Sequence, residues 1–163
     1  PDNHGKTPLM ISACHGHEKI VNLLLDHGAT IDMQDRYGKT AFVLASIRNN
    51  IVISKLLLDR GANIDLKNKR GETALYFASY HNYEAMVRLL LDRGANINLQ
   101  DNYGMTALMV ACKRKNIDVI KLLLNPEANM NLINKHGETA FMFARRRGYA
   151  EIVQMLIEHA AIS

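Results

Sequence analysis

Apolar residues along the chain fall into short segments with helical spacing, separated by polar turns that contain glycine. Residues 20–24 read Ile-Val-Asn-Leu-Leu and residues 119–123 read Val-Ile-Lys-Leu-Leu, which places their apolar side chains on one side of a helix. A shorter segment rich in Ala and Ser precedes each of these. The shorter segments are expected to end at about Cys14, Ile47, Tyr80, Lys113 and Arg146. The pattern predicts an all-α chain built from pairs of helices.

The pairs recur with a fixed period. A turn glycine stands at Gly5, Gly38, Gly71, Gly104 and Gly137, so the interval is 33 residues each time. A period of this size is typical of a stacked repeat array and not of one closed core. The chain is therefore interpreted as a single array over residues 1–163, with units at about 1–33, 34–66, 67–99, 100–132 and 133–163.

Each unit carries start and stop signals for its helices. The Thr two residues after the turn glycine is expected to cap the first helix through its hydroxyl. A polar break that includes Gly16, Asn49, Asn82, Asn116 or Gly148 then separates the two helices. The second helix is expected to stop at Gly28, Gly61 and Gly94, where a left-handed residue closes the last turn.

The recurring motif D-x-x-G-x-T-[PA]-[LF], followed by [IVM]-V-x-L-L-L-x-x-G-A-[NT]-[IM], resembles the ankyrin repeat and covers the chain in five copies. The resemblance implies an all-α, ankyrin-type solenoid of helix-turn-helix units joined by β-hairpin-like loops. Some family residues are missing here. Proline follows the Thr only as Pro8, and the family's His position holds Met10, Val43, Tyr76, Met109 and Met142.

The fourth unit departs most, because Asn125-Pro126-Glu127-Ala128 replaces the Asp-Arg-Gly-Ala of the second and third units. Pro126 cannot continue helical hydrogen bonding. Glu127 falls where a positive φ is expected, at a cost of about 1 kcal/mol. We expect the second helix of this unit to end early and the junction with the fifth unit to be softer.

Candidates for chemistry are all accounted for by the repeat. His4, Cys14 and His15 could bind a soft metal adventitiously, but their spacing is not that of a dedicated zinc site. The glycines are single turn residues, so no phosphate-binding loop is expected. We therefore expect a non-catalytic protein with no cofactor and no metal. Of the methionines, Met142 is assigned to the core along with most others, and Met105 to a solvent-facing turn.

Cys14 and Cys112 lie in the first and fourth units, too far apart for a disulfide if the units stack about 10 Å apart. Free thiols favour a reducing, intracellular location, cytoplasmic or nuclear. No apolar run approaches the roughly 18 residues of a membrane span, and no secretory signal precedes the first repeat. Neither end carries a polar capping unit, which favours excision from a longer array.

In ankyrin-like arrays the partner is usually held by the hairpin tips and first helices of the concave face. Of the thirty such positions, twelve are basic and only Glu72 and Glu138 are acidic, a net charge of +10. The other positions carry eight basic and fourteen acidic residues, or −6, within a chain of +4. The basic residues are Lys6, Arg36, Lys39, Arg48, Lys67, Lys69, Arg70, Lys113, Arg114, Lys135, Arg146 and Arg147.

This sorting of charge predicts a monomeric protein–protein interaction module that binds an acidic or phosphorylated segment of a partner on a basic concave face. Tyr and Arg are enriched in binding hot spots. Recognition of RNA, DNA or a phosphorylated small molecule remains an alternative, as does a spacer or regulatory arm of a larger protein. The predicted partner-binding residues are Arg36, Tyr37, Lys39, Arg48, Lys69, Arg70, Tyr80, His81, Tyr103, Lys113, Arg114, Arg146 and Arg147.

Overall fold

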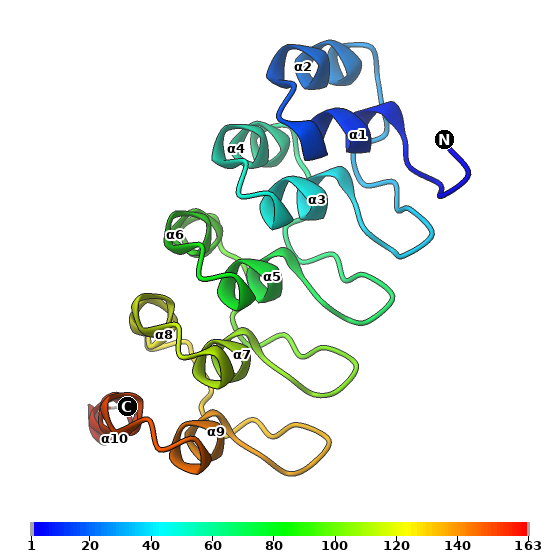
Figure 1. Cartoon of the computed structure of the whole chain (residues 1–163). Helices are drawn as coiled ribbons and strands as arrows, with labels where there is room; N and C mark the ends of the chain where they lie inside the picture. Colours follow the sequence, from blue (N-terminus) through cyan, green and yellow to red (C-terminus); the bar gives the residue numbers. More distant parts are fainter. Residues whose placement is uncertain (1, 163) are drawn as a thin grey trace.

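The computed structural model describes residues 2–162, in which ten helices form five pairs stacked in sequence (Figure 1). No strand occurs in residues 2–162, and the hairpin-like connections are built from turns. The first pair is α1 (Pro8–His15) and α2 (Glu18–Asp26). The others are α3 (Ala41–Ile47) with α4 (Ile51–Asp59), α5 (Ala74–Tyr80) with α6 (Glu84–Asp92), α7 (Ala107–Arg114) with α8 (Ile117–Leu123), and α9 (Ala140–Arg146) with α10 (Ala150–Ile162). The predicted all-α solenoid is confirmed.

The odd-numbered helices form an inner row, with the hairpin turns on one side and the even-numbered helices on the other (Figure 1). Each inner helix packs on the inner helix of the next unit and on the outer helix of its own unit. Alanine at the centre of each inner helix allows this close approach, since no larger side chain separates the helices. Ala13, Ala45, Ala78, Ala111 and Ala144 are all 0% exposed.

Threonine caps all five inner helices, as predicted. The Thr40 hydroxyl oxygen accepts a hydrogen bond from the backbone N–H of Val43 at 3.2 Å, and the other four units repeat this contact. At the far end of the pair, α2, α4 and α6 each stop two residues before a glycine of positive φ. Gly28, for example, has φ +77°. The predicted left-handed helix stop is confirmed.

The break between the helices of the fourth unit consists of Lys115 and Asn116, so it includes Asn116 as predicted. Lys115, not Asn116, adopts the left-handed conformation, with φ 62°, in register with Asn49 and Asn82 at φ 57° and 59°. α7 ends at Arg114, within one residue of the expected Lys113. The position in the repeat fixes the conformation here, even though lysine has no special preference for it.

Two assignments of methionine were wrong. Met105 is only 8% exposed, because the next hairpin covers it and Asn134 Nδ2 lies 3.5 Å from its sulfur. Met142 is 50% exposed, although the equivalent Met10 and Met109 are each 1% exposed. Met142 belongs to the last helix pair of the described residues, so no further pair packs on it.

The second helix of the fourth unit ends early, as predicted. α8 has seven residues and stops at Leu123, whereas α2, α4 and α6 have nine each. The positive φ expected at Glu127 is wrong, since this residue is not among those with positive φ in residues 2–162. Instead, the Asn125 side chain accepts a hydrogen bond from the Glu127 N–H at 2.9 Å, which turns the chain without a left-handed residue.

Candidate binding face

The hairpin turns are held by one Asp or Asn side chain in each unit. Asp35 is 5% exposed, and its Oδ1 accepts hydrogen bonds from the backbone N–H groups of Tyr37 at 2.8 Å and Lys39 at 2.9 Å. Asp and Asn favour turns because their side-chain oxygen is within reach of the backbone two residues on. Asp2, Asn68, Asp101 and Asn134 make the same pair of contacts. The turn at each tip is therefore held in one conformation by its own Asp or Asn side chain.

Successive tips are also joined to one another by the backbone. The Lys69 N–H donates to the Tyr37 carbonyl at 3.0 Å, and the Lys135 N–H donates to the Tyr103 carbonyl at 2.9 Å. Arg36 with His4, and Asn102 with Arg70, complete the series. These bonds hold the tips side by side as one continuous edge. We call the surface formed by this edge and the inner helices the inner face.

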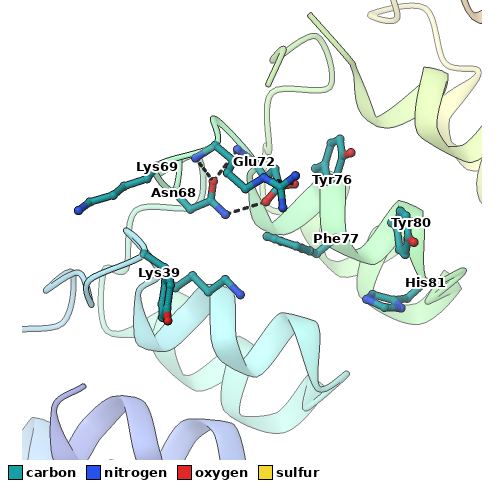
Figure 2. A pocket seen from close by; sticks show the side chains of 10 residues that line it. Lys39, Asn68, Lys69, Glu72, Tyr76, Phe77, Tyr80 and His81 are labelled. Carbon is teal, nitrogen blue, oxygen red and sulfur yellow. Dashed lines mark hydrogen bonds and ion pairs between the residues drawn. The ribbon is translucent and has the colours of Figure 1, made fainter. Parts of the chain in front are cut away.

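The inner face contains two adjoining hollows. The first, of about 470 Å³, lies between the turns of units two and three and the helix α5 (Figure 2). The second, of about 760 Å³, follows it across units three to five. Arg70, Tyr76 and Tyr80 line both. The two hollows thus form a single depression along the array.

Comparison with known families agrees with this architecture. A model described as Ankyrin repeats (3 copies) matches residues 28–101 and 94–163, and a model described as Ankyrin repeat matches residues 4–36. The chain belongs to the ankyrin repeat family. Ankyrin repeats typically mediate protein–protein interactions, and no catalytic family matches the chain. A comparison with curated proteins finds no match.

The ankyrin array brings ten of the thirteen predicted binding residues to the two hollows. The first hollow is lined by Tyr37, Lys39, Lys69, Arg70, Tyr80 and His81. The second is lined by Arg70, Tyr80, Tyr103, Lys113, Arg114 and Arg146. All of these side chains are exposed except Lys39, which is half-buried. Lys39 therefore does not project from the tip but reaches into the hollow, with Nζ 5.5 Å from the centroid of the Phe77 ring.

Arg36, Arg48 and Arg147 are exposed but line neither hollow. Arg36 donates from Nη2 to the Asn3 carbonyl at 2.8 Å, which holds it against the preceding turn. Arg48 donates from Nε to the Cys14 sulfur at 3.5 Å, and this contact raises the pKa of Arg48. Arg147 follows the end of α9. These three residues are set apart from the ten that line the hollows.

The sequence reasoning missed four ring side chains of the hollows as binding residues. Tyr76 and Phe77 line the first hollow, and His136 and Phe143 line the second. The signal for the first two was helical spacing, because residues 76, 77, 80 and 81 share one side of a helix. Burial raises the pKa of Tyr76 to about 12, so its hydroxyl stays a protonated donor at neutral pH.

The two acidic residues of the inner face are held within their own turns. Asn68 Nδ2 donates to Glu72 Oε2 at 2.8 Å, and Asn134 Nδ2 donates to Glu138 Oε2 at 3.0 Å. The bond from Asn134, with Arg146 adding its charge, holds the pKa of Glu138 below its usual value. In the three units whose turn is held by Asp instead of Asn, the residue four positions later is not acidic. Those positions hold Lys6, Lys39 and Met105.

Most cations of the inner face have no acidic partner. Among the described residues, only Arg70 and Arg146 of the twelve form ion pairs, with Glu72 at 3.9 Å and with Glu138. Of the eight basic residues elsewhere, four are paired. Arg114 instead lies over the Tyr80 ring, with its guanidinium carbon 4.5 Å from the ring centroid. The inner face thus presents positive charge that the protein itself does not neutralise.

Two searches add to this description. Within residues 2–162, no group of three or more His, Cys, Asp and Glu side chains is placed to hold a metal ion. In the same range, no helix combines the length and the apolar character needed to cross a membrane.

Proposed function

We propose that this ankyrin array binds an acidic or phosphorylated segment of another protein along its inner face. The observation that carries the proposal is the pair of adjoining hollows, which are lined with aromatic rings and with cations, most of them exposed and without an acidic partner. Arg70 and Arg114 are central to it, because Arg70 lines both hollows and Arg114 is already oriented by Tyr80. Arginine favours such a role because its planar group binds carboxylate and phosphate with two hydrogen bonds.

The separation of charge supports an acidic partner. Complementary charge mainly raises the association rate and selects among partners. The outer helices do not offer the same attraction, since Asp26 and Asp59 neutralise Arg60 and Arg93 there at 2.8 Å each. Cys14 and Cys112 are both free, which supports a reducing, intracellular setting for this interaction.

Selection from a library of random peptides tests the proposal without assuming a partner. Peptides that bind the array are expected to be rich in Asp and Glu. Charge reversal by Arg70→Glu with Arg114→Glu is expected to weaken their binding by about tenfold or more, as for hot-spot residues. Selected peptides without acidic enrichment, or unchanged binding by the doubly substituted array, would overturn the proposal.

A matched control is available on the outer helices. Lys19 in α2 and Lys55 in α4 are exposed and lie away from the inner face, so Lys19→Glu with Lys55→Glu changes the net charge by the same amount. This variant is expected to retain most of the binding. Equal losses in both variants would mean that net charge, and not the inner face, governs binding.

Salt dependence separates the proposal from nucleic-acid recognition. The array is titrated with a labelled single-stranded oligonucleotide and with a selected acidic peptide at several salt concentrations. Tighter binding of the oligonucleotide, with a steep salt dependence from several neutralised phosphates, would favour the polyanion alternative. Absence of binding to either ligand would favour a spacer arm.

A further inference from the structure

The third unit differs from the other four on its inner helix. Tyr76, Phe77 and Tyr80 of α5, with His81 at its C-cap, place four rings at four positions that recur in every unit. No other unit has more than one ring at these positions. Unit four, for example, holds Met109, Val110, Lys113 and Arg114 there. Since the other units stack equally well without these rings, the stack does not require them.

These rings are gathered in the first hollow. Tyr37 completes the set from the preceding turn, so four of the chain's ten Phe and Tyr residues line this one hollow. Figure 2 shows the α5 rings projecting from the helix toward the same side. Tyr76 and Phe77 are half-buried, whereas Tyr80 is 37% exposed. The rings therefore retain apolar surface that a partner could cover.

Contacts between the rings fix their positions in advance. Tyr76 lies edge-on to Phe77 at 5.9 Å between centroids, and Tyr80 lies edge-on to His81 at 5.0 Å. His81 in turn stacks on Tyr83 at 5.3 Å. Binding to such a surface loses little side-chain entropy, because the rings are already ordered.

The charges around the rings exclude a cationic guest. Aromatic walls bind cations when the ring faces are free, but here the protein supplies its own cations. Lys39 Nζ lies 5.5 Å from the Phe77 centroid, and the Arg114 guanidinium carbon lies 4.5 Å from the Tyr80 centroid. The carboxylate of Glu72 is also engaged, by Asn68 at 2.8 Å and by Arg70 at 3.9 Å.

We propose that the hollow over α5 is the anchor site of the array, and that it takes one large aromatic side chain from the middle of an acidic peptide segment. The aromatic side chain packs against Tyr76, Phe77 and Tyr80. The carboxylates on either side of it meet Lys39, which reaches into the hollow from unit two, Arg70, which lines both hollows, and Arg114 of unit four. This inference rests on the proposed function and adds the side chain that gives it specificity.

The test uses two labelled peptides that differ at one residue. Each has glutamates on both sides of a central position, which is tryptophan in one peptide and alanine in the other. Binding is followed by fluorescence anisotropy. The tryptophan peptide is expected to bind the array about tenfold tighter or more, as for a hot-spot aromatic side chain.

The variant Tyr76→Met with Phe77→Val copies Met109 and Val110 of unit four, so its side chains are already compatible with the stack. This variant is expected to bind the tryptophan peptide no more tightly than the alanine peptide. Its affinity for the alanine peptide is expected to stay within about twofold of that of the natural chain. Phe141→Leu, which copies Leu108 outside the hollow, is the control and is expected to keep the preference for tryptophan. Circular dichroism melting curves check that both variants fold.

The outcomes distinguish this inference from the proposed function. The natural chain could bind the two peptides equally, and the variant Arg70→Glu with Arg114→Glu could bind neither. That result would overturn the anchor site and leave the proposed function standing. A preference for tryptophan that survives Tyr76→Met with Phe77→Val would also overturn it. Failure of the tryptophan peptide to bind at all would overturn the anchor site, whereas the proposed function is decided separately by whether the peptides selected from the library are acidic.

Discussion

Asn68 Nδ2 donates a hydrogen bond to Glu72 Oε2 at 2.8 Å inside the turn of the third unit. Both residues are buried, at 7% and 9% exposure, so the pair is shielded from water. The second unit replaces this pair with Asp35 and Lys39. The residue that holds the turn and the residue four positions later therefore form a matched set within each unit.

Exchange of one pair for the other tests this coupling. Glu72→Lys leaves the buried Asn68 amide without its acceptor, and Asn68→Asp places two carboxylates together. Each single change is expected to lower the free energy of unfolding by about 1–3 kcal/mol. The double change reproduces the set of unit two and is expected to cost less than the sum. Urea unfolding measures all three variants, and additive losses would show that the pair is not coupled.

Gly38 and Gly61 both have positive φ but differ in their surroundings. A Cβ atom at Gly38 would lie 2.6 Å from the backbone nitrogen of Lys69, whereas a Cβ atom at Gly61 would have no atom within 4 Å. Gly61→Ala is expected to cost about 1 kcal/mol from backbone strain alone. Gly38→Ala is expected to cost about 1–3 kcal/mol more, since the clash is with backbone. Equal losses on urea unfolding would mean that the tips are not tightly packed.

The repeat explains which features were predictable from sequence. The period, the Thr caps and the glycine helix stops depend on residues within one unit, and all were predicted. The burial of Met105 and the exposure of Met142 depend on whether a neighbouring unit covers the position. Their residue type carries no information about that. The left-handed conformation of Lys115 likewise follows from its place in the repeat, and its residue type does not indicate it.

The sequence predicted the charged residues of the candidate site better than it predicted the hollows that they line. The cations were found because the family resemblance marks the positions four, two and one residues before the turn glycine and one, nine and ten residues after it. Tyr76 and Phe77 lie five and six residues after it, outside those positions. Their contribution becomes clear only when the turn of unit two, with Tyr37 and Lys39, is seen to close the hollow over them.

Cys112 gives a prediction for pH. It is 0% exposed, and burial raises the pKa of its thiol from its ordinary value of 9.0 to about 12. The thiol ionises at lower pH in the unfolded chain than in the folded protein. The contribution of Cys112 to the free energy of unfolding is therefore complete below pH 9 and is lost as the pH rises toward 12. Cys112→Ala is expected to flatten the decline of unfolding free energy over this window. An unchanged pH profile in this variant would contradict the assignment.

The same burial predicts different reactivity for the two thiols. Cys14 is half-buried, whereas Cys112 is within the core. Iodoacetamide at mildly alkaline pH is expected to label Cys14 in the folded protein, and Cys112 only after denaturation. Mass spectrometry of the peptides after digestion measures both. Labelling of Cys112 at a comparable rate in the folded state would show that the fourth unit opens readily.

The junction after α8 lacks an ion pair that the earlier units share. Arg60 pairs with Asp26 and Arg93 pairs with Asp59, each at 2.8 Å and across 34 positions. Pro126 occupies the next place in this series, so Asp92 has no ion-pair partner among the described residues. The segment 125–131 is therefore expected to exchange its amide hydrogens faster than the segment 92–98, and equal rates would contradict this.

Repair of the junction should reverse that difference. Pro126→Arg with Glu127→Gly restores the Arg-Gly of the second and third units, which allows α8 to continue for another half turn and the new arginine to reach Asp92. The free energy of unfolding is expected to rise by about 1 kcal/mol, of which the exposed ion pair contributes about half. Adding Asp92→Ala should remove only that half. If the repaired array is no more stable and its segment 125–131 exchanges as fast as before, Pro126 is not the cause of the weak junction.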